Sequence, residues 1–236
     1  MEREKALSFL TGFRKVVLRS LAAVAVAAIV SFIYARDIMK LLLKTAGIKI
    51  YFFSLPEVFL TALQLALYGG IFFALPLIIY LAWREIRNLV GTRPVYGYAF
   101  ILSAIVLFYG GSLFCYRFVL PSGIGFLISY EGGAVKAMIS VERFVVFCSA
   151  MIFAFGATFE VPIVMLILAK MGIVKSRMLS KTRRFAILFI AIAAAIITPT
   201  PDVYNMMLLA VPMYVLYEAG IVLVKLTERS RGRADR

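Results

Sequence analysis

The chain contains no histidine, and this absence limits the chemistry that it can carry. Without histidine there is no imidazole metal ligand, no serine–histidine or cysteine–histidine pair and no HExxH zinc site. An intramembrane protease is also disfavoured, because neither a GxSxG motif with histidine nor a pair of catalytic aspartates in apolar segments is present. Cys115 and Cys148 lie in apolar segments, where lone cysteines are usually small packing residues, and a disulfide between them stays open. We therefore expect no enzyme, no metal and no cofactor.

The remaining candidates for chemistry are four acids in or beside apolar segments, namely Glu57, Glu160, Asp202 and Glu218. Glu160 stands out because it follows Phe159 and precedes Pro162 well inside a long apolar run. An ionisable residue at that depth is costly unless a polar partner is near, so it indicates a functional site. The alternative is a neutral glutamic acid bonded to a carbonyl that Pro162 frees, such as that of Thr158. Glu218 lies close to a basic tail, and Asp202 has a solvated or helix-capping alternative.

The elements that must position these acids are membrane spans. Of the residues, 63% are hydrophobic and 16% are charged, against about 25% charged in a soluble domain. The net charge of +14 resides in short clusters between apolar runs, which disfavours nucleic-acid binding. We predict an all-α membrane protein with one domain, residues 1–236, and six spans at residues 18–36, 57–83, 95–117, 143–169, 185–199 and 203–224. A signal peptide is the rival for the first span, but no A-x-A site follows Ile33–Ala35.

The distribution of Lys and Arg predicts that both termini are cytoplasmic. Only seven of the 26 basic residues fall in the loops on the opposite side: Arg36, Lys40, Lys44, Lys49, Arg117, Lys136 and Arg143. The last two spans are predicted to be short. Residues 185–197 reach only about 20 Å at 1.5 Å per residue, against a hydrocarbon core of about 30 Å. This pair either thins the membrane or forms an ordinary short hairpin through residues 198–202.

Proline and glycine are expected to shape the bundle. Pro76, Pro162 and Pro212 lie inside spans, where each removes a backbone hydrogen bond and kinks the helix. The small residues at 69–70, 110–111 and 156–157 are expected to let neighbouring backbones approach closely. The loop at residues 120–142 is expected to form short interfacial helices on the outer face.

Several motifs resemble one known family. The fourth span reads Ala154-Phe155-Gly156-Ala157-Thr158-Phe159-Glu160-Val161-Pro162, similar to the AFGxxFExP signature of the TatC family, the core subunit of the twin-arginine protein translocase. The last hairpin and span contain Thr198–Asp202, Pro212 and Leu216-Tyr217-Glu218, similar to the family's TPxD and PxxxLYE elements. Ser54–Glu57 and the end of the third span before Pro121 also resemble the family. The match runs from about residue 54 to the end of the sixth span.

The resemblance implies a fold, a function and a set of sites. The fold would be a kinked, glove-like concave bundle with cytoplasmic termini and two short final helices. The function would be to bind twin-arginine signal peptides and single-span partners of the TatA and TatB types. The resulting oligomeric complex would export folded proteins across the cytoplasmic membrane using the proton motive force. The resemblance implies a partner-binding surface at Glu160, Phe159, Pro162 and Gln64, outer-face structural roles for Glu57, Pro121 and Asp202, and no cofactor.

The chain also departs from the family pattern at the predicted signal-peptide site. Gly12 stands where the family's HLxELRxRL-like segment has a glutamate, and Gly91–Pro94 occupies the stretch where a second acid is expected. Two carboxylates would be natural partners for two guanidinium groups. Glu85, Glu4 or Glu2, together with Arg14, are the candidate substitutes, although Glu85 has Arg84 and Arg87 as neighbours. A paralogue with altered or lost signal-peptide recognition is therefore an alternative.

A proton-coupled secondary transporter that uses Glu160 is the remaining alternative. Such transporters often show paired discontinuous helices and repeat symmetry, and neither pattern is evident in the sequence. Proton-coupled uptake of a small solute into liposomes would favour this alternative.

Overall fold

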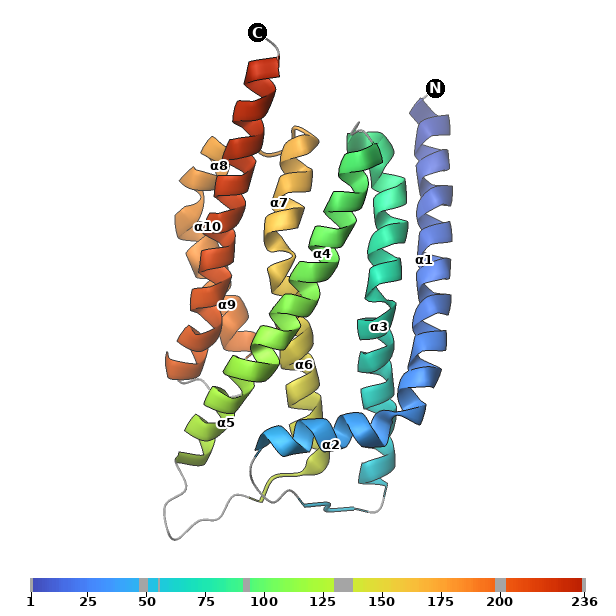
Figure 1. Ribbon diagram of the computed structural model, residues 1–236, viewed down its shortest axis with the longest axis vertical. Helices are drawn as coiled ribbons and strands as arrows, with labels where there is room; N and C mark the ends of the chain where they lie inside the picture. Colours follow the sequence, from blue (N-terminus) through green and yellow to red (C-terminus); the bar gives the residue numbers. More distant parts are fainter. Residues whose placement is uncertain are drawn as a thin grey trace. The chain divides into compact units, whose positions relative to one another are not determined.

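The structure is a computed structural model that describes residues 2–46, 51–54, 56–90, 94–129, 138–197 and 203–234. These residues are nearly all helical, and the only β contact among them is an isolated bridge between Tyr51 and Ser140 (Figure 1). The all-α prediction is confirmed. The elements are α1 (Glu2–Ile33), α2 (Ala35–Ala46), α3 (Glu57–Val90), α4 (Pro94–Phe114), the π-helix η1 (Cys115–Val119), α5 (Leu120–Ser129), α6 (Val141–Phe159), α7 (Val161–Lys170), α8 (Ser176–Lys181), α9 (Arg183–Ile197) and α10 (Val203–Ala234).

Five segments of the described chain are long and apolar enough to cross a membrane. They are Arg14–Ile33, Glu57–Glu85, Gly97–Phe126, Val141–Lys170 and Met206–Arg229. The fifth predicted span corresponds to α9, whose 15 residues reach about 22 Å, so this helix is short as predicted. The prolines Pro199 and Pro201 that follow it lie outside the described residues.

The chain divides into two compact units, Met1–Ile105 with Ile128–Phe153, and Val106–Leu127 with Ala154–Arg236. The helices α4 and α6 each contribute residues to both units. The prediction of one domain over residues 1–236 stays a prediction.

In the first unit α1 packs along α3 in the antiparallel sense (Figure 1). The contact is tight at Gly70, where an added Cβ would lie 2.8 Å from the Cα of Ala28. At the preceding residue of α3, Gly69, an added Cβ would clash with the buried hydroxyl of Ser31. The predicted close approach at residues 69–70 is therefore confirmed, and α1 forms part of the packed bundle.

The helix α2 runs crosswise to α1 and α3 (Figure 1). Its buried side carries Ala35, Met39 and Leu42, which recur every three or four residues, and its other residues are mostly exposed. This is the pattern of an amphipathic helix that lies in a membrane interface. The sequence analysis placed interfacial helices only at residues 120–142, so α2 is an element that it missed.

The third span is longer than predicted because α4, η1 and α5 form one continuous helical segment. Pro121 explains the π-helix at this point, because proline has no N–H to donate to the carbonyl four residues earlier. The preceding Leu120 N–H instead bonds the carbonyl of Cys115, five residues back. Residues 120–129 therefore continue the span, and the expectation that they begin a separate interfacial helix was wrong.

In the second unit α10 packs against α7, α8 and α9. A small core of Met165, Ile221 and Val224 joins α7 to α10. A Cβ at Gly220 would lie 3.3 Å from the Cα of Pro162, so these two helices also approach closely. The helix α10 has 32 residues, so the prediction of a short last helix was wrong as regards its length. It continues past Glu218, because that charge is paired within the protein.

The expected close approaches at the other glycine pairs have different outcomes. A Cβ at Gly156 would lie 2.6 Å from the hydroxyl oxygen of Ser112, and one at Gly111 would lie 2.5 Å from Cγ of Phe159. At Gly111 a backbone atom, the carbonyl oxygen of Phe155, would also lie 2.9 Å away, which confirms the close backbone approach there, whereas the atoms nearest Gly156 all belong to side chains. No atom lies within 4 Å of a Cβ built at Gly110, so there the expectation was wrong.

Candidate functional site

The fourth span is interrupted at Glu160. The helix α6 ends at Phe159 and α7 begins at Val161, because Pro162 supplies no backbone donor and turns the chain. The N–H of Glu160 bonds the carbonyl of Ala157 at 3.2 Å, and the carbonyl of Glu160 accepts from Ile163 at 3.0 Å. The interruption thus fixes the backbone of Glu160 at the junction of two helices.

The carboxyl group of Glu160 is incompletely bonded. Its Oε1 is buried and has no hydrogen-bond partner among the described residues. The hydroxyl of Thr158 does not serve it, because that group donates to the carbonyl of Ala154 at 2.8 Å. A buried polar atom without a partner costs about 1–3 kcal/mol. A hydrogen bond from this carboxyl to the carbonyl of Thr158, which the alternative requires, is not present among the described residues.

The neighbours of Glu160 hold this junction in place. The ring of Phe159 lies 6.0 Å from the ring of Phe114 and covers Gly111. Pro162 is buried and faces Gly220 of α10. Phe159 and Pro162 thus both pack within the second unit on the two sides of Glu160 along the chain.

Gln64, the fourth predicted partner-binding residue, lies in the first unit on α3. Its Nε2 donates to Oε1 of Glu142 at 3.0 Å, while its own Oε1 is buried and has no partner among the described residues. Gln64 therefore shares with Glu160 an unsatisfied buried oxygen. The contact with Glu142 could not be found from the sequence, because the two residues lie 78 positions apart.

Glu57 is buried, with 4% of its surface exposed, and its carboxylate is fully bonded. One oxygen accepts from the backbone N–H groups of Phe53 at 2.6 Å and Ser54 at 3.2 Å. The other accepts from the hydroxyl of Ser140 at 2.5 Å and the backbone N–H of Glu142 at 3.3 Å. One side chain thus joins the N-terminal ends of α3 and α6, and negative charge is favourable at both.

Two of the predicted signal-peptide residues lie at the same end of the α1–α3 pair. Ala28 of α1 lies beside Gly70 of α3, and the two helices are antiparallel. Fourteen residues before Ala28 is Arg14, and fourteen residues after Gly70 is Arg84, so these two positions lie at the same end of the pair. Glu85 is therefore level with Arg14. Glu85 is half-buried and Arg14 is exposed, and neither makes an ion pair with a described residue. Glu4 lies on α1, but its side chain is outside the described part of the chain.

The remaining predicted residues have separate positions. Pro121 is exposed in the first turn of α5. Asp202 lies outside the described residues. Cys115 and Cys148 are both buried and are not joined by a disulfide, so the open disulfide alternative is not present.

Two polar contacts of α10 were not predicted from the sequence. The carboxylate of Glu218 forms a two-point pair with Arg183, with N–O distances of 2.8 and 2.9 Å, and also accepts from the hydroxyl of Tyr214 at 3.0 Å. Glu228 accepts from the N–H of Ser176 at 2.9 Å and also from its hydroxyl. The excess of cations in residues 170–184 was the signal that could have indicated partners for these two acids.

Taken together, the spans and the broken fourth span define a polytopic α-helical membrane protein that carries an incompletely bonded carboxyl at a helix junction. Residues 8–212 match the family model described as Sec-independent protein translocase protein (TatC). The chain therefore belongs to the TatC family.

Relatives and a solved structure agree with this assignment. The chain is 36% identical over 220 residues to the Sec-independent protein translocase protein TatC of Deinococcus radiodurans, covering 89% of this chain and 82% of that protein. It is 32% identical over 223 residues to the protein of the same name from Carboxydothermus hydrogenoformans, covering 92% and 90%. A crystal structure of the twin-arginine translocase receptor TatC matches with a TM-score of 0.83 at 30% identity, covering 92% of this chain and 98% of that one.

Proposed function

We propose that this protein is the receptor and scaffold subunit of a twin-arginine protein translocase. In this role it binds twin-arginine signal peptides and single-span partners of the TatA and TatB types, and the complex exports folded proteins using the proton motive force. The location is the cytoplasmic membrane of a bacterium or archaeon, with both termini cytoplasmic. Membership of the TatC family supports the receptor role, and no catalytic step is assigned to the chain.

The observation that carries the docking part of the proposal is the unpartnered buried Oε1 of Glu160. A single-span helix with a hydroxyl, amide or amine in its membrane segment would donate to this oxygen. The gain is largest in a low-dielectric setting, where an unpaired polar group is most costly. Phe159 and Pro162 hold the site rigid, so little ordering is needed on binding. Gln64, in the other unit, is proposed as a separate partner-binding residue, because its Oε1 has no partner among the described residues.

The docking test is co-purification of epitope-tagged TatA- and TatB-type partners with Glu160→Ala and Glu160→Gln. Alanine removes the acceptor, so we expect the amount of bound partner to fall about 5- to 30-fold, the equivalent of one buried hydrogen bond to a polar or charged group. Glutamine keeps an acceptor oxygen and should retain most binding. The matched control is Val164→Ala, an exposed position one turn along α7. Unchanged co-purification of Glu160→Ala would refute the docking site.

We further propose that signal peptides are recognised at the end of the α1–α3 pair where Glu85 lies level with Arg14. The carboxylate of Glu85 has no described partner, so it is available to a guanidinium group of a signal peptide. Arginine presents two parallel donors to a carboxylate, whereas lysine presents a point charge. A twin-arginine peptide should therefore bind more tightly than its twin-lysine version.

The test is a titration of both peptides against the wild type, Glu85→Gln and the control Asp37→Asn, which removes an exposed acid from α2. We expect Glu85→Gln to lose the arginine preference and Asp37→Asn to keep it. If neither peptide binds any variant, the chain is a paralogue that has lost direct signal-peptide recognition. Gly12 and the acid-free Gly91–Pro94 stretch favour that second candidate.

A further inference from the structure

The junction of α1 and α2 encloses an apolar groove that the receptor function does not use. The transmembrane helix α1 ends at Ile33, and after the turn at Tyr34 the chain continues crosswise as α2. A cavity of about 750 Å³ lies between the end of α1, one flank of α2 and the first turns of α3. We call it the elbow groove. Its apolar walls include Phe32, Ile33, Leu43, Val58 and Phe59.

The walls of the elbow groove leave much apolar surface uncovered. Ile33 is 70% exposed and Phe59 is 60% exposed, and the rings of Phe32 and Phe59 meet edge to face with 6.4 Å between centroids. In a membrane protein such a surface at the end of a span faces lipid. The candidate span Arg14–Ile33 ends here, so the groove is an apolar recess at the end of a membrane span.

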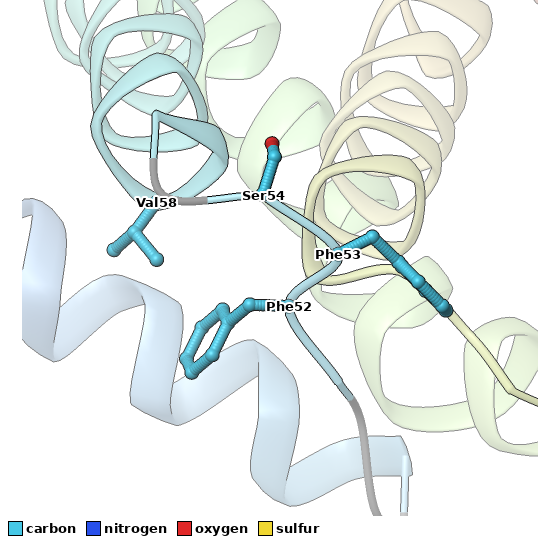
Figure 2. A pocket seen from close by; sticks show the side chains of 4 residues that line it. All are labelled: Phe52, Phe53, Ser54 and Val58. Atoms are coloured by element: carbon cyan, nitrogen blue, oxygen red, sulfur yellow. The ribbon is translucent and has the colours of Figure 1, made fainter.

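A second hollow adjoins the elbow groove through a shared residue. It has a volume of about 290 Å³ and is lined by Phe52, Phe53, Ser54 and Val58, and Val58 also lines the elbow groove. Figure 2 shows the side chains of Phe52 and Val58 on one side of the segment and Phe53 directed away from them. The apolar wall therefore extends from α3 onto the loop before it.

Two cations line the polar rim of the elbow groove. Arg36 and Lys40 are one turn apart on α2 and both line the cavity. The guanidinium group of Arg36 has no described partner, and Lys40 contacts only the exposed carboxylate of Asp37, at 3.2 Å. An exposed pair of this kind contributes little, so the ammonium group is readily available to another anion. Lys44 continues the row on α2 but does not line the groove.

The charge is unusual for its place in the chain. If the termini are cytoplasmic, α2 lies on the opposite side, which is otherwise poor in Lys and Arg, and residues 36–49 carry four of the seven cations there. Basic side chains next to an apolar recess are the combination that recognises the headgroup and the chains of an anionic lipid together. A free phosphate would use the cations but would leave the apolar walls uncovered.

We propose that the elbow groove binds one anionic phospholipid, with its phosphate between Arg36 and Lys40 and the first part of an acyl chain over Phe32 and Phe59. The side chains of Arg36 and Lys40 reach toward the headgroup while their methylene groups lie on the apolar wall. The bound lipid covers surface that the protein leaves exposed and fixes the angle between α1 and α2. This site stands independently of signal-peptide or partner binding.

The test is native mass spectrometry of the purified full-length protein in a neutral detergent, with phosphatidylglycerol and phosphatidylcholine of identical acyl chains as probes. We expect the wild type to retain one phosphatidylglycerol in preference to phosphatidylcholine. The double variant Arg36→Gln/Lys40→Gln should lose this preference by roughly 25-fold, about fivefold for each cation. Ala62→Trp, which fills the groove and leaves every charge in place, should lose both lipids.

The controls separate this site from general attraction. Lys44→Gln removes a cation of the same helix outside the groove and should keep the preference; an equal loss would show unspecific charge attraction and overturn the proposal. Loss of the preference on adding inorganic phosphate, with Ala62→Trp behaving as the wild type, would indicate a free-anion site and would also overturn it. So would a second copy of the chain occupying the groove, detected as a dimer that Ala62→Trp abolishes. If circular dichroism shows that the double variant is unfolded, the single variants are used, each with the fivefold expectation.

Discussion

The close crossing of α1 and α3 allows one prediction to be worked out in detail. An alanine at Gly70 would place its Cβ 2.7 Å from the Cβ, 2.8 Å from the Cα and 2.9 Å from the N of Ala28. Carbon atoms in contact prefer about 3.5–4.0 Å, so α1 would have to move by about 0.8 Å. Two of the opposing atoms are backbone, so no rotamer change relieves the clash. Overpacking of this kind costs about 1–3 kcal/mol.

The assay uses the two thiols of the protein. Cys115 and Cys148 are not in a disulfide and are 0% exposed, so a thiol-reactive fluorophore reports unfolding when the detergent-solubilised protein is heated. We expect Gly70→Ala to lower the midpoint by about 2–4 °C for each kcal/mol lost, as for other chains of this length. The change also weakens the packing that holds the first span in the first unit.

The matched control is Gly110→Ala, another glycine in the interior of a membrane-spanning helix. A Cβ at Gly110 meets nothing within 4 Å, and alanine in a helix interior is better than glycine by about 0.5–1 kcal/mol. The control should therefore unfold at an equal or higher temperature than the wild type. If Gly70→Ala is as stable as Gly110→Ala, α1 and α3 do not touch at Gly70 in the way described, and the reasoning is refuted.

Three further changes test polar contacts in the same thermal assay. Glu57→Ala removes the acceptor of four donors and should lower the midpoint more than Glu57→Gln, which keeps one acceptor oxygen; equal effects would contradict the described bonding. Arg183→Ala should lower the midpoint because it leaves the carboxylate of the half-buried Glu218 without its cation. In the double variant Arg183→Ala/Glu218→Gln part of the lost midpoint should return, whereas the effects of two independent sites would simply add. Ser31→Ala removes a buried hydroxyl without a described partner and should be neutral or stabilising, so a clear loss would reveal a missed hydrogen bond.

Much of the helical pattern was readable from the sequence because the membrane forces each span to be apolar and to satisfy its own backbone. A kink near Glu160 was also readable from Pro162, but its size was not, because Pro76 and Pro212 lie inside the continuous helices α3 and α10 whereas the fourth span is divided at Glu160. The amphipathic helix α2 left a clear signal that was overlooked, with Ala35, Met39 and Leu42 on one face and the cations on the next. The four cations in residues 36–49 mark the end of an apolar run, so charge alone favours a loop there.

Other features depend on contacts that the sequence order hides. The predicted last span ends at residue 224, but α10 continues to Ala234, and the pairing of Glu218 with Arg183, 35 positions earlier, could not be read from the order of the sequence. The bonding of Glu57 was unpredictable for the same reason, since Ser140 lies 83 positions away. That Oε1 of Glu160 lacks a hydrogen-bond partner among the described residues needed coordinates, because an absence of contacts cannot be inferred from residue types.

The π-helix at Cys115–Val119 bears on how this chain compares with its relatives. One wider turn accommodates a single additional residue within an otherwise α-helical segment, and each later side chain is rotated by about 100° around the axis. A relative without the wider turn would show a gap of one position here when the two sequences are aligned. When the two structures are compared, residues beyond Val119 are equivalent if their side chains point in the same direction. Counting residues from the start of α4 would pair the wrong positions.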